Sequence, residues 1–283
     1  MFPSISRTWI WALAAVLLLT SVGDATAKRR KRRSKKEGTV VDISGARSRL
    51  AGADAAAAVA AARKLGLAAG DQRADAAAAL AAALAVGVEP DVAIAALKSL
   101  AKLEQRRALV VIRSYGKHRQ GRVRAETLRV LAALDLQGSN KKIVAGLSDR
   151  DPDVRTAAAR LIAEHDLRQG VDALVALLRR GEELAVPALG QLADKKSAAA
   201  VSKLVGAAPD ALVSRALGAM LLNPKFGPDD LRLEVVKTLG AGPGNESIEA
   251  LSSYVASIPA KPPRASRKEA ELIVEKRLTE GSN

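Results

Sequence analysis

The feature that most constrains the fold of this sequence is a motif that returns about every thirty residues. The aligned apolar positions are Val92, Val123, Val154, Leu184 and Val213, and they are separated by 31, 31, 30 and 29 residues. Between 53 and 258 the chain alternates segments of helical pattern with short breaks that carry Gly, Pro, Asp or Asn. A fixed period with two helices per unit is typical of an α-solenoid. We therefore expect an all-α superhelix of about six antiparallel helix pairs.

The breaks predict where the helices lie. We expect the pairs 53–66 with 72–86, 90–102 with 105–117, 122–134 with 139–148, 152–164 with 169–180, and 182–193 with 197–206. After residue 206 the period slips, and one of the helices expected at 210–222, 229–240 and 246–257 is left without a partner. The solenoid would occupy 46–258, followed by a Pro-rich linker at 259–263. A capping box of Ser266 and Glu269 would then open a last helix within 264–283 that covers the final repeat.

One unit, at 147–181, resembles the HEAT repeat, most closely the short bacterial form related to the HEAT-like repeats of phycobilin lyases. The resemblance rests on 147–155 (LSDRDPDVR), 157–162 and 170–178, and in a looser form it covers about 50–258. It implies a curved stack in which the second helix of each pair lines the concave face. It also implies that Asp153 and Arg155 form hydrogen bonds between neighbouring repeats. The resemblance also raises bilin lyase activity as an alternative, but the sequence identifies no chromophore site.

The composition argues against most catalytic chemistry. Apolar residues make up 48% of the chain and aromatic residues only 2%, so the core is expected to consist of Ala, Leu and Val. The chain has no Cys, which removes disulfides, thiolate nucleophiles and Cys-based metal sites. The two His residues, His118 and His165, fall in different repeats, and neither has a second ligand or a nucleophile at a useful spacing. We therefore expect a noncatalytic protein without metal or cofactor.

The N-terminus has the pattern of a secretory signal. Arg7 gives the N-terminal segment a positive charge, and residues 9–22 are apolar. The small residues Ala25 and Ala27 precede a cleavage site before Lys28. This predicts a signal peptide at 1–27 and a periplasmic or secreted protein. The strongly basic segment that follows favours an alternative, because such segments tend to remain cytoplasmic. In that alternative the apolar stretch anchors a cytoplasmic body to the inner membrane.

The net charge of +15 is concentrated in two places. The first is an arm at 28–45, predicted to be disordered because it lacks apolar periodicity. Its basic residues are Lys28, Arg29, Arg30, Lys31, Arg32, Arg33, Lys35 and Lys36. Such an arm is either a solvated tail or a tether to anionic lipid, nucleic acid or acidic protein. The second place is 98–142, which holds twelve Lys and Arg against three acidic residues.

Within the second cluster, the helix expected at 105–117 carries a basic stripe. Arg106, Arg113 and Lys117 are spaced i, i+7 and i+11, which places them on one side of an α-helix. Arg119, Arg122, Arg124 and Arg129 extend the positive charge into the next repeat. If 105–117 is the second helix of its pair, the resemblance implies that the stripe lines the concave groove. The stripe is interpreted either as a solvated face or as a docking site for an acidic partner.

These observations lead to one functional hypothesis and one alternative. The hypothesis is a noncatalytic scaffold of the cell envelope that binds an acidic segment of another protein in a basic concave groove. The alternative is a nucleic-acid-associated protein with a membrane-anchored cytoplasmic body. The scarcity of aromatic side chains argues against base stacking, so binding of nucleic acid would depend on phosphate contacts and be sensitive to salt.

Overall fold

The computed structural model describes residues 40–242 and 244–280, and all regular structure in this part of the chain is helical. The α-helices of the N-terminal half are α2 (Ile43–Leu50), α3 (Ala55–Leu65), α4 (Gln72–Val86), α5 (Pro90–Leu103), α6 (Leu109–Ser114) and α7 (Gly121–Ala145). Those of the C-terminal half are α8 (Pro152–Glu164), α9 (Val171–Arg179), α10 (Ala185–Gln191), α11 (Lys195–Ser202), α12 (Asp210–Leu222), α13 (Asp229–Ala241), α14 (Asn245–Ser257) and α15 (Ala265–Glu280). Four short 3₁₀ segments, at Arg106–Ala108, Tyr115–Lys117, Gly146–Ser148 and Arg168–Gly170, adjoin these helices.

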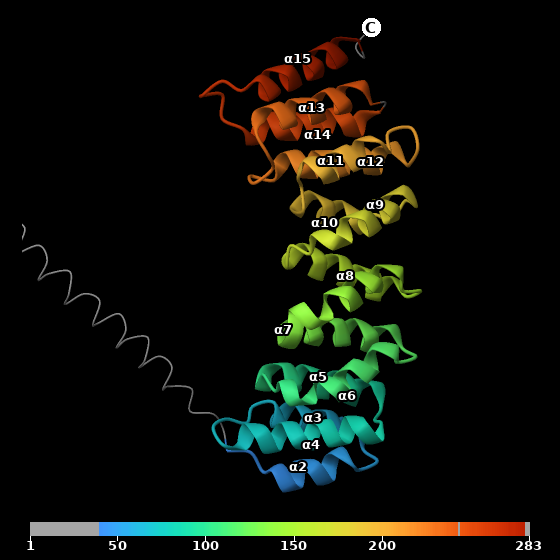
Figure 1. Cartoon of the computed structure of the whole chain (residues 1–283), viewed down its shortest axis with the longest axis vertical. Helices are drawn as coiled ribbons and strands as arrows, with labels where there is room; N and C mark the ends of the chain where they lie inside the picture. The colour runs from blue at the N-terminus through green and yellow to red at the C-terminus, as the bar shows by residue number, and fades with distance from the viewer. Residues whose placement is uncertain (1–39, 243, 281–283) are drawn as a thin grey trace, which may run out of the picture.

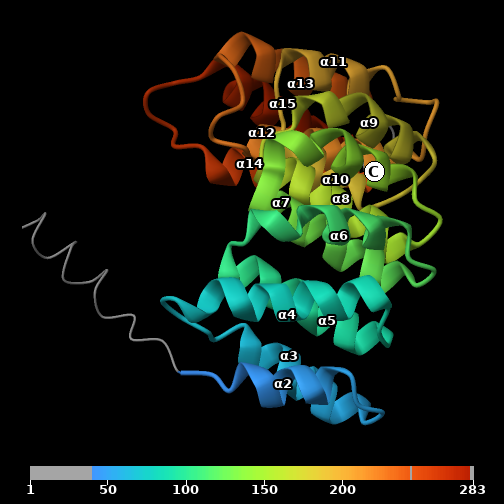
Figure 2. The same cartoon turned by 60° about the horizontal axis from the view of Figure 1, so that its bottom comes forward.

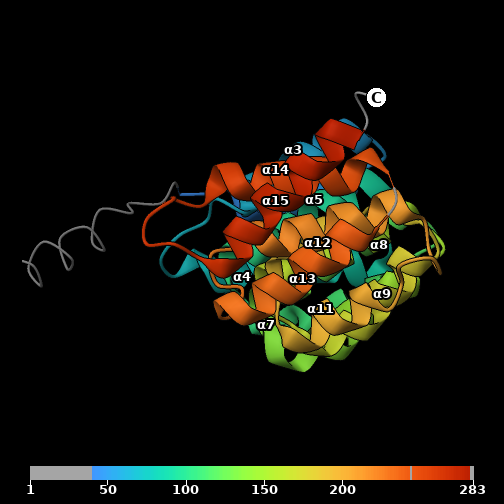
Figure 3. The same cartoon turned by 90° about the horizontal axis from the view of Figure 1, so that it is seen from above.

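The helices stack into one elongated array with α2 at one end and α15 at the other (Figure 1). Helix α7 is divided at Asp135, whose φ of −154° and ψ of 64° are not helical, so its two halves form one helix pair. The first helices of successive pairs, α3, α5, α7, α8, α10, α12 and α14, pack against one another along the array. Figure 3 shows the array along its long axis, with the C-terminal helices nearest the viewer. The predicted α-solenoid is confirmed, with seven consecutive helix pairs from α3 to α15.

Local sequence explains several helix starts. Pro90 and Pro152 occupy the first turn of α5 and α8, where a missing N–H leaves no intrahelical bond unmade. The side chain of Asp151 caps α8 by accepting a hydrogen bond from the backbone N–H of Asp153 at 3.0 Å. Asp194 and Ser197 form a reciprocal capping box at the start of α11.

Arginine side chains connect neighbouring repeats. The Arg124 guanidinium donates to both carboxylate oxygens of Asp149, at 2.6 and 2.9 Å, and to the carbonyls of His118 and Arg119. Thirty-one residues later, Arg155 repeats the pattern with the carboxylate of Glu182, at 2.7 Å, and two backbone carbonyls. Arg155 therefore has the inter-repeat role that the resemblance implied. Asp153 does not, since it forms no ion pair within the described residues, and Asp149 is the acidic member of this ladder.

The sequence suggested that the helix pairing slips after residue 206, but the structure shows no such slip. Helix α12 packs on α13 and α14 packs on α15, so each of the expected helices has a partner. The segment 259–263 is the loop within the last pair rather than a linker after the solenoid. The predicted capping box is absent: Ser266 lies inside the first turn of α15, its N–H donates to Asp229 at 3.2 Å, and its hydroxyl pairs with that of Tyr254 at 2.7 Å.

The N-terminal boundary also differs from the sequence prediction. Helix α2 begins at Ile43, inside the segment 28–45 that was expected to be disordered. Asp42 caps it, and Gln72 of α4 forms hydrogen bonds with both the N–H and the carbonyl of Val41. Figure 2 brings this end of the array forward and shows α2 beside α3. No helix in the described part of the chain is long and apolar enough to cross a membrane.

Candidate binding surfaces at the N-terminal end

The basic stripe predicted at 105–117 does not lie on one continuous α-helix. Only Leu109–Ser114 is α-helical, and a 3₁₀ segment precedes and follows it. Because a 3₁₀ helix has three residues per turn, the spacing of Arg106, Arg113 and Lys117 no longer places them in one line. Arg113 is held by Asp135 of the next pair at 2.6 Å. The uninterrupted stripe is therefore a wrong prediction, caused by the assumption of one helical period.

Two residues of that basic cluster, Arg113 and Lys117, nevertheless lie near Lys142, which was not among the predicted site residues. The ammonium group of Lys142 donates to the carbonyl of Arg113 at 2.8 Å. Burial lowers the pKa of Lys142, and the nearby charges of Lys117 and Arg113 lower it further. The pattern that could have identified Lys142 is its position 29 residues after Arg113, which is close to one repeat.

Three of the other predicted site residues already form ion pairs within the protein. Arg124 is buried in the ladder with Asp149. Arg122 pairs with Asp91, and Arg129 pairs with Glu126 at 3.1 Å. Arg106, Lys117 and Arg119 are exposed and form no ion pair with a described residue. The residues of the polybasic arm, 28–36, lie outside the described residues.

A hollow lies between helices α3 and α5, where the sequence predicted no site. It has a volume of about 1080 Å³. Its apolar wall includes Val59 and Ile94, and Leu67, with 55% of its surface exposed, extends it at one end. Four basic side chains line the same hollow, two from each helix: Arg63, Lys64, Lys98 and Lys102. We call this hollow the α3/α5 groove.

The charges around the α3/α5 groove are unbalanced. Arg63, Lys64 and Lys102 form no ion pair within the described residues, and Lys98 is 3.9 Å from Glu126. The one acidic residue that lines the groove, Asp91, is already paired with Arg122. The groove therefore presents apolar surface together with positive charge that the protein itself does not neutralise.

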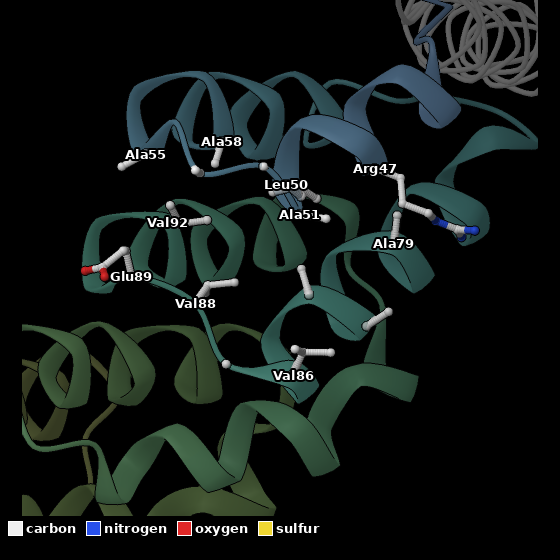
Figure 4. Close-up of a pocket in the computed structure, with 15 residues that line it drawn as sticks. Arg47, Leu50, Ala51, Ala55, Ala58, Ala79, Val86, Val88, Glu89 and Val92 are labelled. Atoms are coloured by element: carbon white, nitrogen blue, oxygen red, sulfur yellow. The ribbon is translucent and has the colours of Figure 1, made fainter.

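A second hollow lies on the other side of α3 (Figure 4). It has a volume of about 710 Å³ and is lined by α2, the start of α3, the second half of α4 and the start of α5. Nearly all of its lining is Ala, Val, Leu or Gly. The two charged side chains that line it are Arg47 and Glu89. We call this hollow the α2/α4 pocket.

Other chemistry is sparse in the described residues. They contain no group of three or more His, Asp and Glu side chains arranged to hold a metal ion. The ring of His118 stacks on Tyr115, with 5.9 Å between ring centroids and 5° between planes. The aromatic residues of the described segment, Tyr115, Phe226 and Tyr254, are all buried. None of the three therefore presents an exposed ring on which a nucleic-acid base could stack.

Comparisons with known proteins give similarity of fold only. No family model matches the chain, and no curated protein matches it in sequence. Among solved structures, a crystal structure of an engineered protein is 18% identical with a TM-score of 0.35, and the match covers 85% of this chain and 98% of that one. The structure of the CpcE–CpcF complex of phycocyanin lyase from Nostoc sp. PCC7120 is 17% identical with a TM-score of 0.37, covering 85% of this chain and 96% of that one.

The second comparison corrects one expectation. The sequence, which has no recognisable catalytic residues, predicted a noncatalytic protein. The CpcE–CpcF complex belongs to a lyase, which is an enzyme, and the match contradicts the expectation. The expectation of a noncatalytic protein is therefore withdrawn.

Proposed function

We propose that this protein is a HEAT-like interaction scaffold that binds an acidic, amphipathic segment of another protein in the α3/α5 groove. The observation that carries the proposal is the unneutralised positive charge of this groove beside its exposed apolar wall. A partner segment with Leu-like side chains on one side and carboxylates beside them would match both properties.

The structure changes which residues we assign to the partner. The sequence pointed to Arg106, Arg113 and Lys117, but Arg113 already has a carboxylate partner in the protein. On α3 and α5, by contrast, Arg63, Lys64 and Lys102 form no ion pair with a described residue. Two of the residues in the original hypothesis border this face: Arg122 holds Asp91 at the groove, and Arg129 shares Glu126 with Lys98.

The proposal is tested with a labelled synthetic peptide that alternates Glu and Leu at helical spacing, followed by fluorescence anisotropy. Lys98→Glu with Lys102→Glu should weaken binding at least tenfold. Lys203→Glu with Lys237→Glu is the matched control, because it changes the net charge equally at exposed positions of the C-terminal half. Equal loss in both variants would mean nonspecific attraction and would overturn the assignment.

Two competing ligands test the specificity of binding in the same assay. A poly-Glu peptide of equal charge should bind more weakly, because it lacks side chains for the wall of Val59 and Ile94. A short DNA duplex should compete poorly at physiological salt, since phosphate contacts alone are lost steeply as salt rises. Tighter binding of the duplex, still dependent on Lys98 and Lys102, would replace the protein partner with nucleic acid.

We also propose that residues 1–27 direct export, so that the groove acts in the cell envelope. The support is the sequence pattern of Arg7, the apolar stretch and the small residues before Lys28. Intact mass of the natively expressed protein after cell fractionation tests this. An exported species that begins at Lys28 is expected, whereas a membrane-bound species that retains Met1 would contradict it.

A further inference from the structure

The α2/α4 pocket exists because α2 is too short to cover its neighbour. Gln72 at the start of α4 binds the backbone of Val41, just before α2, so the two helices start side by side. Helix α2 ends at Leu50 after 8 residues, whereas α4 continues for 15. At about 1.5 Å per residue, roughly 10 Å of α4 extends beyond the end of α2.

The part of α4 that α2 leaves open carries a regular apolar stripe. Ala79, Ala82, Ala83 and Val86 line the pocket at the spacing i, i+3, i+4 and i+7. Ala79, where the covered part of α4 ends, is buried, whereas Ala83 is half-buried and Ala82 and Val86 are exposed. This is the spacing with which one helix face contacts another helix. Val86 is 90% exposed at the end of the stripe, so the described structure offers it almost no packing.

The other walls of the pocket come from three neighbouring helices. Leu50 and Ala51 lie at the end of α2, Ala58 belongs to α3, and Val92 to α5 (Figure 4). Because the facing side chains on α4 are small, a helix backbone can approach it closely, as Gly190 and Ala219 allow between α10 and α12.

The charges at the pocket indicate what kind of helix fits. Arg47 from α2 and Glu89 at the end of the α4–α5 loop lie on opposite sides of the apolar lining (Figure 4). Neither forms an ion pair with another described residue. One positive and one negative end match a helix with an acidic residue near one terminus and a basic residue near the other.

We propose that the α2/α4 pocket binds a short amphipathic helix of another protein, which lies parallel to α4 and continues the stack where α2 ends. In this orientation the acidic residue of the ligand precedes its apolar stripe and faces Arg47, and the basic residue follows the stripe and faces Glu89. This binding site adjoins the α3/α5 groove, with which it shares Ala55 as a lining residue, but it does not depend on the ligand assigned to that groove.

The experiment uses a labelled synthetic helical peptide of about fourteen residues, which spans about 21 Å. It consists of Ala and Gln with Leu at i, i+3, i+4 and i+7, a Glu before this stripe and a Lys after it. A second peptide has the Glu and Lys exchanged, and a third has Gln in place of each Leu. Anisotropy titrations with the full chain should show saturable binding of the first peptide, at least fivefold weaker binding of the second, and none of the third.

Variants of the protein then locate the binding. Ala83→Trp should abolish binding by filling the pocket, and Val86→Gln should weaken it at a residue too exposed to affect folding. Arg47→Glu combined with Glu89→Lys should reverse the preference between the first two peptides. Lys98→Glu with Lys102→Glu should leave all titrations unchanged, which separates this site from the α3/α5 groove. Absence of saturable binding to the unmodified protein, or binding insensitive to Ala83→Trp and Val86→Gln, would overturn the proposal.

Discussion

The two ends of this solenoid are built differently, although both follow the same repeat. The described core falls into two clusters that meet in α7, one from Val41 to Leu134 and one from Ala125 to Ala270. Ala provides 12 of the 27 buried apolar residues in the first cluster but 11 of 38 in the second. Because a methyl side chain buries little area and fills little volume, the N-terminal end is held by weaker packing.

Polar contacts differ in the same way. The middle repeats are joined by guanidinium groups that each bind a carboxylate and two carbonyls, as Arg124 and Arg155 do. At the N-terminal end Arg63, Lys64 and Lys102 form no ion pair with a described residue, the carboxylate partner of Arg73 is exposed, and both large hollows lie there. The comparison suggests a division in which the middle of the array gives rigidity and the N-terminal end retains surface for binding.

The largest expected effect comes from breaking the ladder in the middle. Arg124→Leu leaves the carboxylate of Asp149, 18% exposed, without its main partner and should lower the free energy of unfolding by about 3 kcal/mol. The N-terminal counterpart is Arg73→Leu, where Glu104 is 80% exposed and the ion pair contributes about 1 kcal/mol or less. Urea denaturation of the two variants measures the difference. Equal losses would contradict the proposed contrast between the two ends.

The next effect tests how closely the helices approach each other. A Cβ at Gly190 would lie 2.7 Å from that of Ala219 and 3.3 Å from its carbonyl oxygen. Because backbone must move to admit it, Gly190→Ala should cost about 1–3 kcal/mol. Gly52→Ala, in the turn between α2 and α3, meets no atom closer than 3.4 Å and should change stability by less than about 0.5 kcal/mol. A neutral Gly190→Ala in thermal unfolding would show that α10 and α12 are not tightly packed.

Much of the fold follows from the sequence because the repeat constrains it at many places at once. The period of the aligned apolar positions predicted the first helices of successive pairs, and Pro90 and Pro152 fixed two helix starts. The pairing after residue 206 was harder to predict, because in the sequence the Pro-containing breaks around Pro228 and Pro262 look like places where the helical array stops. In the structure they are ordinary loops, and packing of α13 and α15 completes the last pairs.

The candidate sites were less predictable, because they depend on which charges are already paired. Arg113 and Asp135 are 22 residues apart, and only the folded chain reveals that they form an ion pair. Similarly, the sequence shows an Ala-rich α4 but not that α2 ends halfway along it. A basic stripe on a helical projection is therefore a hypothesis about charge, whereas a binding surface requires knowledge of the partners within the fold.

A smaller effect is expected from acidification. The hydrogen bond from Arg124 lowers the pKa of Asp149 from its ordinary value. The stabilisation is therefore fully present above the unfolded pKa, about 3.9, and is lost as the pH falls through the lower folded value. The loss should be smaller than that in Arg124→Leu, because Arg124 keeps its hydrogen bonds to the carbonyls of His118 and Arg119 when Asp149 is protonated. Comparison of the wild type with Asp149→Asn between pH 7 and pH 3 tests this: the difference in stability should shrink, and a constant difference would contradict the assignment.

The smallest expected effect is a gain in stability at the N-terminal end. Ala83 lines the α2/α4 pocket, so Ala83→Leu adds apolar surface that leaves water on folding, for a gain of about 0.5–1 kcal/mol. Ala78→Leu is the matched control, because Ala78 lies on the exposed side of the same helix and should give no gain. Thermal unfolding measures both. If the two substitutions have the same effect, the pocket wall does not pack a larger side chain, and the looseness of this end lies elsewhere than in the uncovered half of α4.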